Sequence, residues 1–311
     1  MTGSGQSVLT PHSGPEHSIA TLWWVMFGVA CVGLTFIATL LLLGWIRRNR
    51  ASLPFGGGEW AATRLVVGLG IATPIVLLSA LFVWSDVFVI RSTAAPPPRT
   101  TAMTIQVIGH QWFWEIRYGR GQATTANELH VPVRTRVNVV GTTADVIHSL
   151  WVPELNRKVD VIPGRTNRVL LYADRPGTYL GQCAEFCGVQ HAHMELIVVA
   201  EPRSRFDSWL RTEGTPLASA TTGQGLRLFL SDGCANCHAI GGTPAQAHVG
   251  PDLTHVGSRT TLAAGTIPND RAQLAAWLRD PQRIKPGSKM PKLPLSQPDL
   301  AGLVSYLESL K

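Results

Sequence analysis

Two long runs of apolar residues stand out in the first third of the chain. One covers residues 17–46 and the other covers residues 65–85, and neither run contains a charged side chain. A helix needs roughly 20 apolar residues to cross the hydrocarbon core of a bilayer. The pattern therefore predicts a two-helix transmembrane hairpin within residues 1–91, with spans at about 19–46 and 65–88.

After the stiff spacer Pro96-Pro97-Pro98, the apolar residues occur in short runs instead. These runs are rich in β-branched and aromatic residues and are separated by turn signals such as Pro163-Gly164, a pattern that predicts strands. The strands are expected at 104–108, 112–118, 131–140, 168–172 and 196–199. Many short strands at this spacing are typical of a β-sandwich or barrel, which we expect in residues 92–212.

The last part of the chain has helical periodicity. Residues 213–222 are small and polar, a composition typical of a flexible linker. Beyond them, helices are expected near 225–230, 272–278 and 298–310, the last with Leu300, Leu303 and Leu307 on one face. We therefore expect a separate, all-α domain in residues 223–311.

Charge predicts how the chain is oriented in the membrane. Only 15% of the residues are charged and 45% are hydrophobic, which excludes a disordered chain. No Lys or Arg precedes Arg47, whereas Arg47, Arg48, Arg50 and Arg64 lie between the two apolar runs. The positive-inside rule puts that loop in the cytoplasm and both termini outside. The first run is too long for a signal peptide and lacks its basic start.

A heme-attachment motif lies near the start of the expected all-α domain. The segment Cys234-Ala-Asn-Cys237-His238 is a CxxCH sequence, in which two thiols can form thioethers to a heme while the histidine binds the iron. A disulfide or a redox CxxC pair are the alternatives, but the redox pair would require a βαβ context that is absent here. The candidates for the second axial ligand are His248, His255 and Met290.

A second pair of cysteines, Cys183 and Cys187, lies among other soft ligands. His148 precedes the pair, and His191 and Met194 follow it. Two thiolates, two imidazoles and a thioether form a polarisable set that selects copper over hard cations. Zinc uses Cys and His but rarely Met. The sequence therefore predicts a copper site in the strand-rich segment.

The pattern CxExCxxxHxxM with a distant His-Ser pair resembles the dinuclear copper centre called CuA. Together with the anchor, the strand-rich segment and the CxxCH motif, it makes nearly the whole chain resemble subunit II of cytochrome c oxidase, with a class I cytochrome c fused at its C-terminus. The resemblance implies a multidomain membrane protein. Its parts would be a two-helix transmembrane hairpin, an all-β cupredoxin-like sandwich and an all-α cytochrome c domain.

The resemblance also implies the ligands of both centres. Cys183 and Cys187 would bridge two copper ions. His148 and Met194 would complete one copper site, and His191 with the main-chain carbonyl of Glu185 would complete the other. For heme c, the implied residues are Cys234 and Cys237 as covalent attachments and His238 and Met290 as axial ligands. In the family, the side chain corresponding to Glu185 approaches a magnesium site shared with subunit I.

Further positions match the family without being ligands. Trp112 would lie between the donor's docking surface and the copper, whereas Trp114 is expected to pack in the core. Asp160 matches a segment facing subunit I and is treated as structural, and His193 matches no ligand position. Where many relatives carry an acidic pair that opens a proton path, this chain offers Glu59.

These features predict the electron-input subunit of a proton-translocating, dioxygen-reducing cytochrome c oxidase. Electrons would pass from a donor, via heme c and CuA, to subunit I, and the expected partners are subunit I, subunit III and a cytochrome donor, with no nucleic acid. The expected location is a bacterial inner membrane, crossed twice, with both termini and the redox domains on the periplasmic side. The alternative is a free-standing membrane-tethered redox or copper-delivery protein without an oxidase core.

Charge around Met290 suggests which donor would bind. The basic residues near it are Arg279, Arg283, Lys285, Lys289 and Lys292, with Asp280 as the only acid among them. A basic ring beside a heme would steer an acidic donor toward it. The alternative is a solvated basic loop that binds nothing.

Overall fold

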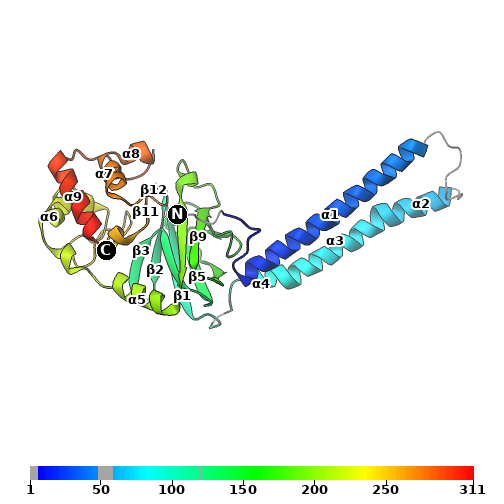
Figure 1. Cartoon of the computed structure of the whole chain (residues 1–311), viewed down its shortest axis with the longest axis horizontal. Coiled ribbons are helices and arrows are strands. Elements are labelled where there is room, and N and C mark those ends of the chain that lie inside the picture. Colours follow the sequence, from blue (N-terminus) through cyan, green and yellow to red (C-terminus); the bar gives the residue numbers. More distant parts are fainter. Residues whose placement is uncertain (1–5, 48–58, 98, 120) are drawn as a thin grey trace. The chain divides into compact units, whose positions relative to one another are not determined.

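The computed structural model describes residues 6–47, 59–97, 99–119 and 121–311 (Figure 1). Residues 17–94 form one compact unit, apart from those not described. The described residues of 1–16, together with those of 95–311, form the other unit. Arg48, Arg50 and Pro98, on which some sequence predictions rest, lie outside the described residues.

The smaller unit is a pair of long helices. The first is α1 (Gly14–Arg47). The second runs through α2 (Glu59–Val67), a π-helical turn (Gly68–Ala72), α3 (Thr73–Trp84), a second π-helical turn (Ser85–Ile90) and α4 (Arg91–Thr93). Both helices are long and apolar enough to cross a membrane, and the described residues of their most apolar windows are not buried. The two predicted spans fall within these helices.

The first π-helical turn has a local cause. Pro74 lies at the start of α3, and proline cannot donate the usual helical hydrogen bond to the carbonyl four residues earlier. The chain widens here, because the amide of Thr73 donates to the Gly68 carbonyl five residues back. The Thr73 hydroxyl donates to the same carbonyl at 2.9 Å, which satisfies the oxygen that the wider turn leaves less well bonded.

The larger unit contains a β-sandwich of two five-stranded sheets, here called the sandwich domain (residues 95–213) (Figure 1). One sheet has the order β3 (Ala123–Ala126), β2 (Phe113–Tyr118), β1 (Met103–His110), β5 (Val137–Thr143) and β8 (Asn167–Leu171). The other has the order β4 (Glu128–Pro132), β10 (Glu195–Glu201), β9 (Gly177–Cys183), β6 (His148–Trp151) and β7 (Val159–Val161).

Side chains that alternate between the two faces of each strand form the core between the two sheets. Successive side chains of a strand point to opposite faces, and β5 accordingly alternates between buried and half-buried residues over its whole length. Ile105 of the first sheet and Leu196 of the second are both fully buried and belong to one apolar core. The sheets therefore pack face to face and hold the loops at their ends in place.

The strand predictions were correct for four of the five runs. β1, β2, β8 and β10 cover them, but the predicted strand 131–140 is divided into β4 and β5. Arg134 has a φ of 54°, so the chain turns there instead of continuing as a strand. Helix α5 (Arg203–Glu213) was not predicted, and its Phe206 packs in the core of the sandwich.

The helical domain, residues 223–311, has its own apolar core. Its helices are α6 (Gln224–Ser231), α7 (Arg271–Arg279), α8 (Pro281–Ile284) and α9 (Gln297–Ser309), and a short ribbon pairs β11 (Thr261–Leu262) with β12 (Ile267–Pro268). Helices α6 and α9 approach closely at Gly225, where an added Cβ would lie 2.3 Å from Cβ of Tyr306. The three predicted helices correspond to α6, α7 and α9.

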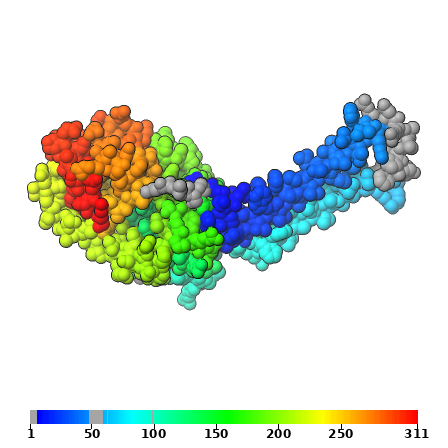
Figure 2. Space-filling model, viewed as in Figure 1, coloured from blue at the N-terminus to red at the C-terminus, as the bar shows by residue number. Residues whose placement is uncertain are grey.

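The segment expected to be a flexible linker is packed. Ala220 is fully buried, and its carbonyl accepts a hydrogen bond of 2.9 Å from the Tyr306 hydroxyl. Gly214 approaches the sandwich so closely that an added Cβ would lie 2.1 Å from the carbonyl oxygen of Gln122. In Figure 2 the yellow to red atoms of the helical domain adjoin the green atoms of the sandwich domain, which agrees with their assignment to one unit.

Candidate metal and heme centres

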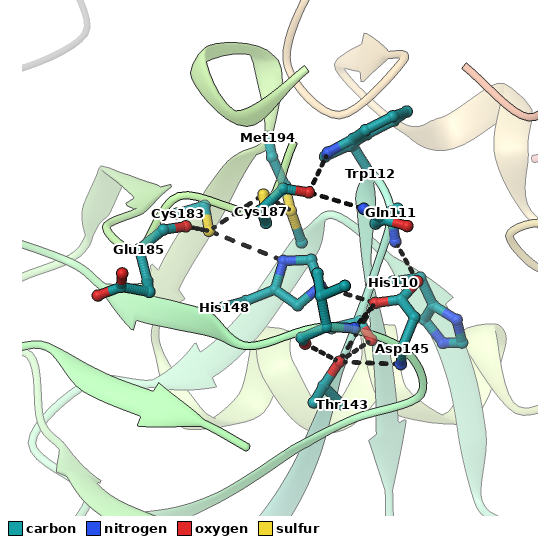
Figure 3. A network of polar contacts seen from close by, with 12 residues as sticks. His110, Gln111, Trp112, Thr143, Asp145, His148, Cys183, Glu185, Cys187 and Met194 are labelled. Atoms are coloured by element: carbon teal, nitrogen blue, oxygen red, sulfur yellow. Dashed lines mark hydrogen bonds and ion pairs between the residues drawn. The ribbon is translucent and has the colours of Figure 1, made fainter. Parts of the chain in front are cut away.

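Five of the six residues predicted to bind copper come from one loop and its flanking strand. Cys183 ends β9, and Glu185, Cys187, His191 and Met194 lie on the loop that leads from β9 to β10. The amide of Cys183 donates to the Met194 carbonyl at 2.9 Å and closes the loop. β6 pairs with β9, with Leu150 opposite Cys183, and this register brings His148 beside the loop (Figure 3).

The side chains and one carbonyl converge around the two sulfur atoms. The Sγ atoms of Cys183 and Cys187 lie 3.8 Å apart. The other atoms near them are Nδ1 of His148 (3.8 Å from Cys183 Sγ), the Glu185 carbonyl (3.2 Å from Cys183 Sγ), Nδ1 of His191 (3.7 Å from Cys187 Sγ) and Sδ of Met194 (3.9 Å from Cys187 Sγ). The structure therefore brings together all six residues that the sequence predicted to bind copper.

The two thiols favour a state in which Cys183 is deprotonated and Cys187 keeps its proton. The hydrogen bond from Cys187 lowers the pKa of Cys183 to about 3, in spite of burial. The same contact, with burial, raises the pKa of Cys187. A cation bound between them would favour the thiolate form of both. Because thiolates are soft ligands, the cluster fits copper.

His148 is held in the tautomer that a metal ligand needs. Its Nε2 lies 2.9 Å from Oδ1 of Asp145, so that nitrogen can carry the proton and leave Nδ1 facing Cys183 as a lone pair. Burial lowers the pKa of His148, but the hydrogen bonds with Cys183 and Asp145 outweigh burial and raise it. Gly109 makes room for the ring, because an added Cβ would lie 2.8 Å from its Cδ2.

Trp112 and Gln111 both bind the copper loop. The indole Nε1 of Trp112 donates to the Cys187 carbonyl at 3.0 Å, and Nε2 of Gln111 donates to the same oxygen at 2.8 Å (Figure 3). The amide of Gln111 donates to Asp145 at 2.7 Å. Trp114, by contrast, is fully buried in the sandwich core, as the sequence predicted.

Two predicted non-ligand groups are turned away from the cluster. The side chain of Glu185 is exposed, although its carbonyl faces Cys183. His193 is also exposed, and its Nδ1 lies 2.7 Å from Oε1 of Gln190. The carboxylate of Glu185 is therefore free to meet another molecule.

The residues predicted to bind heme border one cavity of about 200 Å³ in the helical domain. Its walls are mostly apolar, and Cys234, Cys237, His238 and Met290 all line it. Neither of the other axial candidates lines this cavity: His248 is exposed, and Nε2 of the buried His255 lies 3.1 Å from the Thr215 carbonyl. The cavity thus supports Met290 among the three candidates and fits a flat apolar group.

His238 is prepared to bind a metal through Nε2. Its Nδ1 lies 2.8 Å from the Pro251 carbonyl, which can only accept a hydrogen bond, so Nδ1 carries the hydrogen and Nε2 keeps its lone pair. Burial lowers the pKa of His238 and favours the neutral ring. Gly250 allows this position, because an added Cβ would lie 2.5 Å from Cε1 of the ring.

Comparison with known proteins identifies the family. Residues 119–201 match the family described as cytochrome c oxidase subunit II, periplasmic domain, and residues 223–311 match the cytochrome c family. A protein of Alkalihalophilus pseudofirmus named cytochrome c oxidase subunit 2 is 35% identical over 258 residues, covering 81% of this chain and 72% of that protein. The chain belongs to the cytochrome c oxidase subunit II family.

Other relatives of the subunit II family cover similar regions. The cytochrome c oxidase subunit 2 of Bacillus sp. (strain PS3) is 29% identical over 266 residues, covering 81% of this chain and 73% of that protein. The crystal structure of the periplasmic domain of subunit II from Bradyrhizobium japonicum is 32% identical and covers 38% of this chain and 96% of its own, with a TM-score of 0.36. The match to the family models and to the 35% identical relative confirms the predicted resemblance to subunit II.

One residue of the basic ring predicted for this subunit II is not on the surface. Lys285 is 3% exposed, and its Nζ lies 3.0 Å from the Trp112 carbonyl, 2.6 Å from the His193 carbonyl and 2.8 Å from the Ala263 carbonyl. Burial lowers the pKa of Lys285 to about 7, although the charges of Cys187 and Glu195 oppose that change. Lys285 therefore cannot contact a donor as predicted.

The other members of the ring are exposed, but two of them are already paired. Lys289 lies 3.5 Å from Asp145, and Lys292 lies 3.0 Å from Asp280. Arg279 and Arg283 are exposed as well. The predicted ring is thus reduced to four exposed cations, two of them partly neutralised.

Proposed function

We propose that this chain is the electron-input subunit of a cytochrome c oxidase, passing electrons from a donor, via heme c and CuA, toward heme-copper subunit I. The observation that carries the proposal is the position of Trp112. It lines the cavity bordered by the CxxCH residues, and its indole donates to the carbonyl of Cys187 in the copper cluster. Trp112 therefore borders both proposed centres.

The proposed copper ligands are the residues that converge on the two sulfur atoms: His148, Cys183, the carbonyl of Glu185, Cys187, His191 and Met194. The short distances between their ligand atoms, and the burial of His148, Cys183, Cys187 and Met194, support the set. The proposed heme attachments are Cys234 and Cys237, with His238 and Met290 as axial ligands. When bound, the copper pair and the heme each take up and release one electron at a time.

The residues around the copper cluster keep it rigid and dry. Met194 and His148 are fully buried, so bulk water does not reach their ligand atoms. Asp145 fixes the imidazole of His148, and Gln111 with Trp112 fixes the Cys187 carbonyl. Ligands held by packing and hydrogen bonds move little when the charge of a centre changes, which favours fast electron transfer.

The chain is a membrane-anchored subunit that works with other oxidase subunits. We place it in a bacterial inner membrane, with both termini and the redox domains on the periplasmic side, and subunit III among its partners. The exposed carboxylate of Glu185 supports a magnesium site shared with subunit I. Glu59, exposed at the start of α2, is proposed as the acid that takes up protons.

The domain limits belong to the same proposal. They are 1–91 for the anchor, 92–212 for the copper domain, 213–222 for the connection and 223–311 for the cytochrome domain.

The donor is proposed to be an acidic cytochrome, because four cations remain exposed near Met290. The copper-delivery alternative is disfavoured by the buried ligand set, since a protein that hands over copper needs exposed ligands.

Metal analysis of the full-length chain, produced without heme-copper subunit I and that subunit's own copper and heme, tests this function. We expect two copper ions and one heme per chain, with the heme resistant to extraction because thioether bonds hold it. The ratio follows from two ligand sets that share no residue. A copper-to-heme ratio near one would contradict the dinuclear centre, and extractable heme would contradict attachment through Cys234 and Cys237.

A further inference from the structure

Lys285 is a buried cation that forms no hydrogen bond with a carboxylate among the described residues. Lysine is almost never fully buried unless it is paired, yet the three acceptors around its Nζ are all main-chain carbonyls, at 2.6 to 3.0 Å. An ammonium group has three N–H donors, and three carbonyls satisfy them completely. The side chain therefore occupies a position built to receive it.

The three carbonyls belong to two different domains. Ala263 follows β11 in the helical domain, whereas Trp112 and His193 belong to the sandwich domain. His193 immediately precedes Met194 of the copper cluster, and Trp112 binds the Cys187 carbonyl. Lys285 thus connects the helical domain to both main-chain segments that border the copper cluster.

Lys285 is also connected to the heme cavity. It lines that cavity and directly follows α8. Gln282 of the same helix donates from Nε2 to the Met290 carbonyl at 2.8 Å. On the other side, Nε2 of Gln190 donates to the carbonyl of Pro286 at 2.7 Å. The loop that carries Met290 is therefore bound to the copper loop at two adjacent residues.

A second charged side chain, Glu128 of the sandwich domain, crosses the interface in the other direction. Glu128 of β4 is 5% exposed and accepts hydrogen bonds of 2.6 Å from both the amide and the hydroxyl of Thr260 in the helical domain. Phe113 and Ala126 of the sandwich pack on Ala264 near these side chains. The interface therefore combines an apolar contact with two buried charged side chains. Lys285 extends from the helical domain into the sandwich domain, and Glu128 extends the other way.

We propose that Lys285 is a positioning residue that locks the cytochrome domain against the copper loop, so that electrons pass between the two centres in one fixed arrangement. This proposal rests on the proposed function and deepens it. It replaces the picture of a cytochrome on a flexible tether that must find the copper domain anew for each transfer. Without Lys285, the carbonyls of Trp112 and His193 would lose the donor that the ammonium group supplies, whereas that of Ala263 would keep the Thr266 hydroxyl. An acceptor left without a partner at an interface is costly.

The test uses the full-length chain in its assembled oxidase, with Lys285→Met as the variant. Methionine has a similar length and suits an apolar site but donates no hydrogen bond. Lys292→Met is the matched control, because Lys292 is exposed and pairs with Asp280 inside the helical domain. Should Lys285→Met fail to fold, Lys285→Gln, which keeps a shorter donor, serves in its place.

The first readout is amide hydrogen exchange at the domain interface. The amide of Glu195 donates to Ala264, and that of Thr260 donates to Glu128. Exchange at both amides should accelerate about tenfold or more in Lys285→Met, because local opening exposes them, and should stay unchanged in Lys292→Met. The second readout is heme-to-copper transfer after rapid heme reduction, which should slow about tenfold in Lys285→Met, with heme and copper spectra retained.

Unchanged exchange together with an unchanged transfer rate would overturn the role of Lys285. Slower transfer without faster exchange would overturn it too, because the effect would then not arise from loosened domains. Amide exchange does not depend on redox activity. A wild-type chain without copper or covalent heme would therefore refute the proposed function, while the exchange comparison would still decide on Lys285.

Discussion

Met194 and Met290 have the same side chain but lie at two different proposed centres, the copper cluster and the heme cavity. Met194 is fully buried, and its Sδ lies 3.9 Å from Sγ of Cys187. Met290 is half-buried and lines the heme cavity, and its carbonyl accepts a hydrogen bond from Gln282. A thioether is a weak, soft ligand in either place. Its effect on a reduction potential is therefore set by the centre that it faces.

Truncating each methionine should affect one centre only. In Met290→Ala we expect a lower heme potential or an open sixth position, with an unchanged copper spectrum, because loss of a thioether ligand removes the stabilisation of reduced iron. Met194→Ala should change the copper spectrum and leave the heme as it is. Optical and electron paramagnetic resonance spectra of the purified oxidase measure both. Crossed effects would show that the two ligand sets are wrongly assigned.

Ligand types were predictable at the residue scale, but the residues that orient them were not. The spacing of Cys183, Cys187, His191 and Met194 is local, so one stretch of sequence shows it. Gln111 bonds the Cys187 carbonyl 76 positions away, and Lys285 bonds the His193 carbonyl 92 positions away. Only the folded chain brings such pairs together, and in the sequence Lys285 looks like any other member of a basic run.

At the scale of elements, periodicity predicted most of the longer strands and helices, but it missed the seven-residue β9 and helix α5 as well as the shortest strands. β6 has four residues and β7 has three, too few for an alternating pattern to show. Helix α5 was missed because most of its residues are polar, and only Phe206 is a large apolar side chain buried on it. Its stability comes from packing on the sandwich, and such packing overrides local propensity.

The crossing of α6 and α9 gives a test of packing in the helical domain. In Gly225→Ala the new methyl would lie 2.3 Å from Cβ of Tyr306, so the helices must move apart. We expect the free energy of unfolding of this domain to fall by about 1–3 kcal/mol, the usual cost of overpacking. Thermal unfolding of the full-length protein, followed by heme absorbance, measures the loss.

Gln224→Ala is the control for this helix pair, because Gln224 is exposed one position earlier on α6. Its midpoint should stay near that of the wild type. If Gly225→Ala were equally neutral, the close approach of α6 and α9 would not exist in the protein. Alanine has a higher helix propensity than glycine, which alone would stabilise α6. A loss of stability in Gly225→Ala would therefore come from overpacking against Tyr306.

For the whole molecule, composition predicted three parts, but it also predicted a flexible linker where the structure has a packed connection. Residues 213–222 are small and polar, a composition typical of flexible linkers, and only the fold shows what they pack against. The burial of Ala220 and the close approach of Gly214 to the Gln122 carbonyl show that the connection is packed. A packed connection leaves the cytochrome little freedom to search, so the rate of electron input should depend on the external donor.

Docking of that donor should depend on salt. Arg279 and Arg283 are exposed cations near Met290 that form no ion pair with any described residue, and the chain carries a net charge of +7. Between about 10 and 150 mM salt the Debye length shrinks from about 30 to 8 Å, so reduction of the heme by an acidic cytochrome should slow steeply. Arg279→Glu with Arg283→Glu should slow it at low salt and leave heme-to-copper transfer unchanged.

A control with the same net charge separates local docking from the overall field. Arg203→Glu with Arg205→Glu reverses two exposed charges on α5 instead, and should slow the donor much less, because steering is strongest where the charges surround the docking surface. Stopped-flow reduction with an acidic and a basic cytochrome measures both variants. If the basic cytochrome reduced the wild-type heme faster, or if both double variants slowed the acidic one equally, the cations near Met290 would be solvated surface and the donor would dock elsewhere.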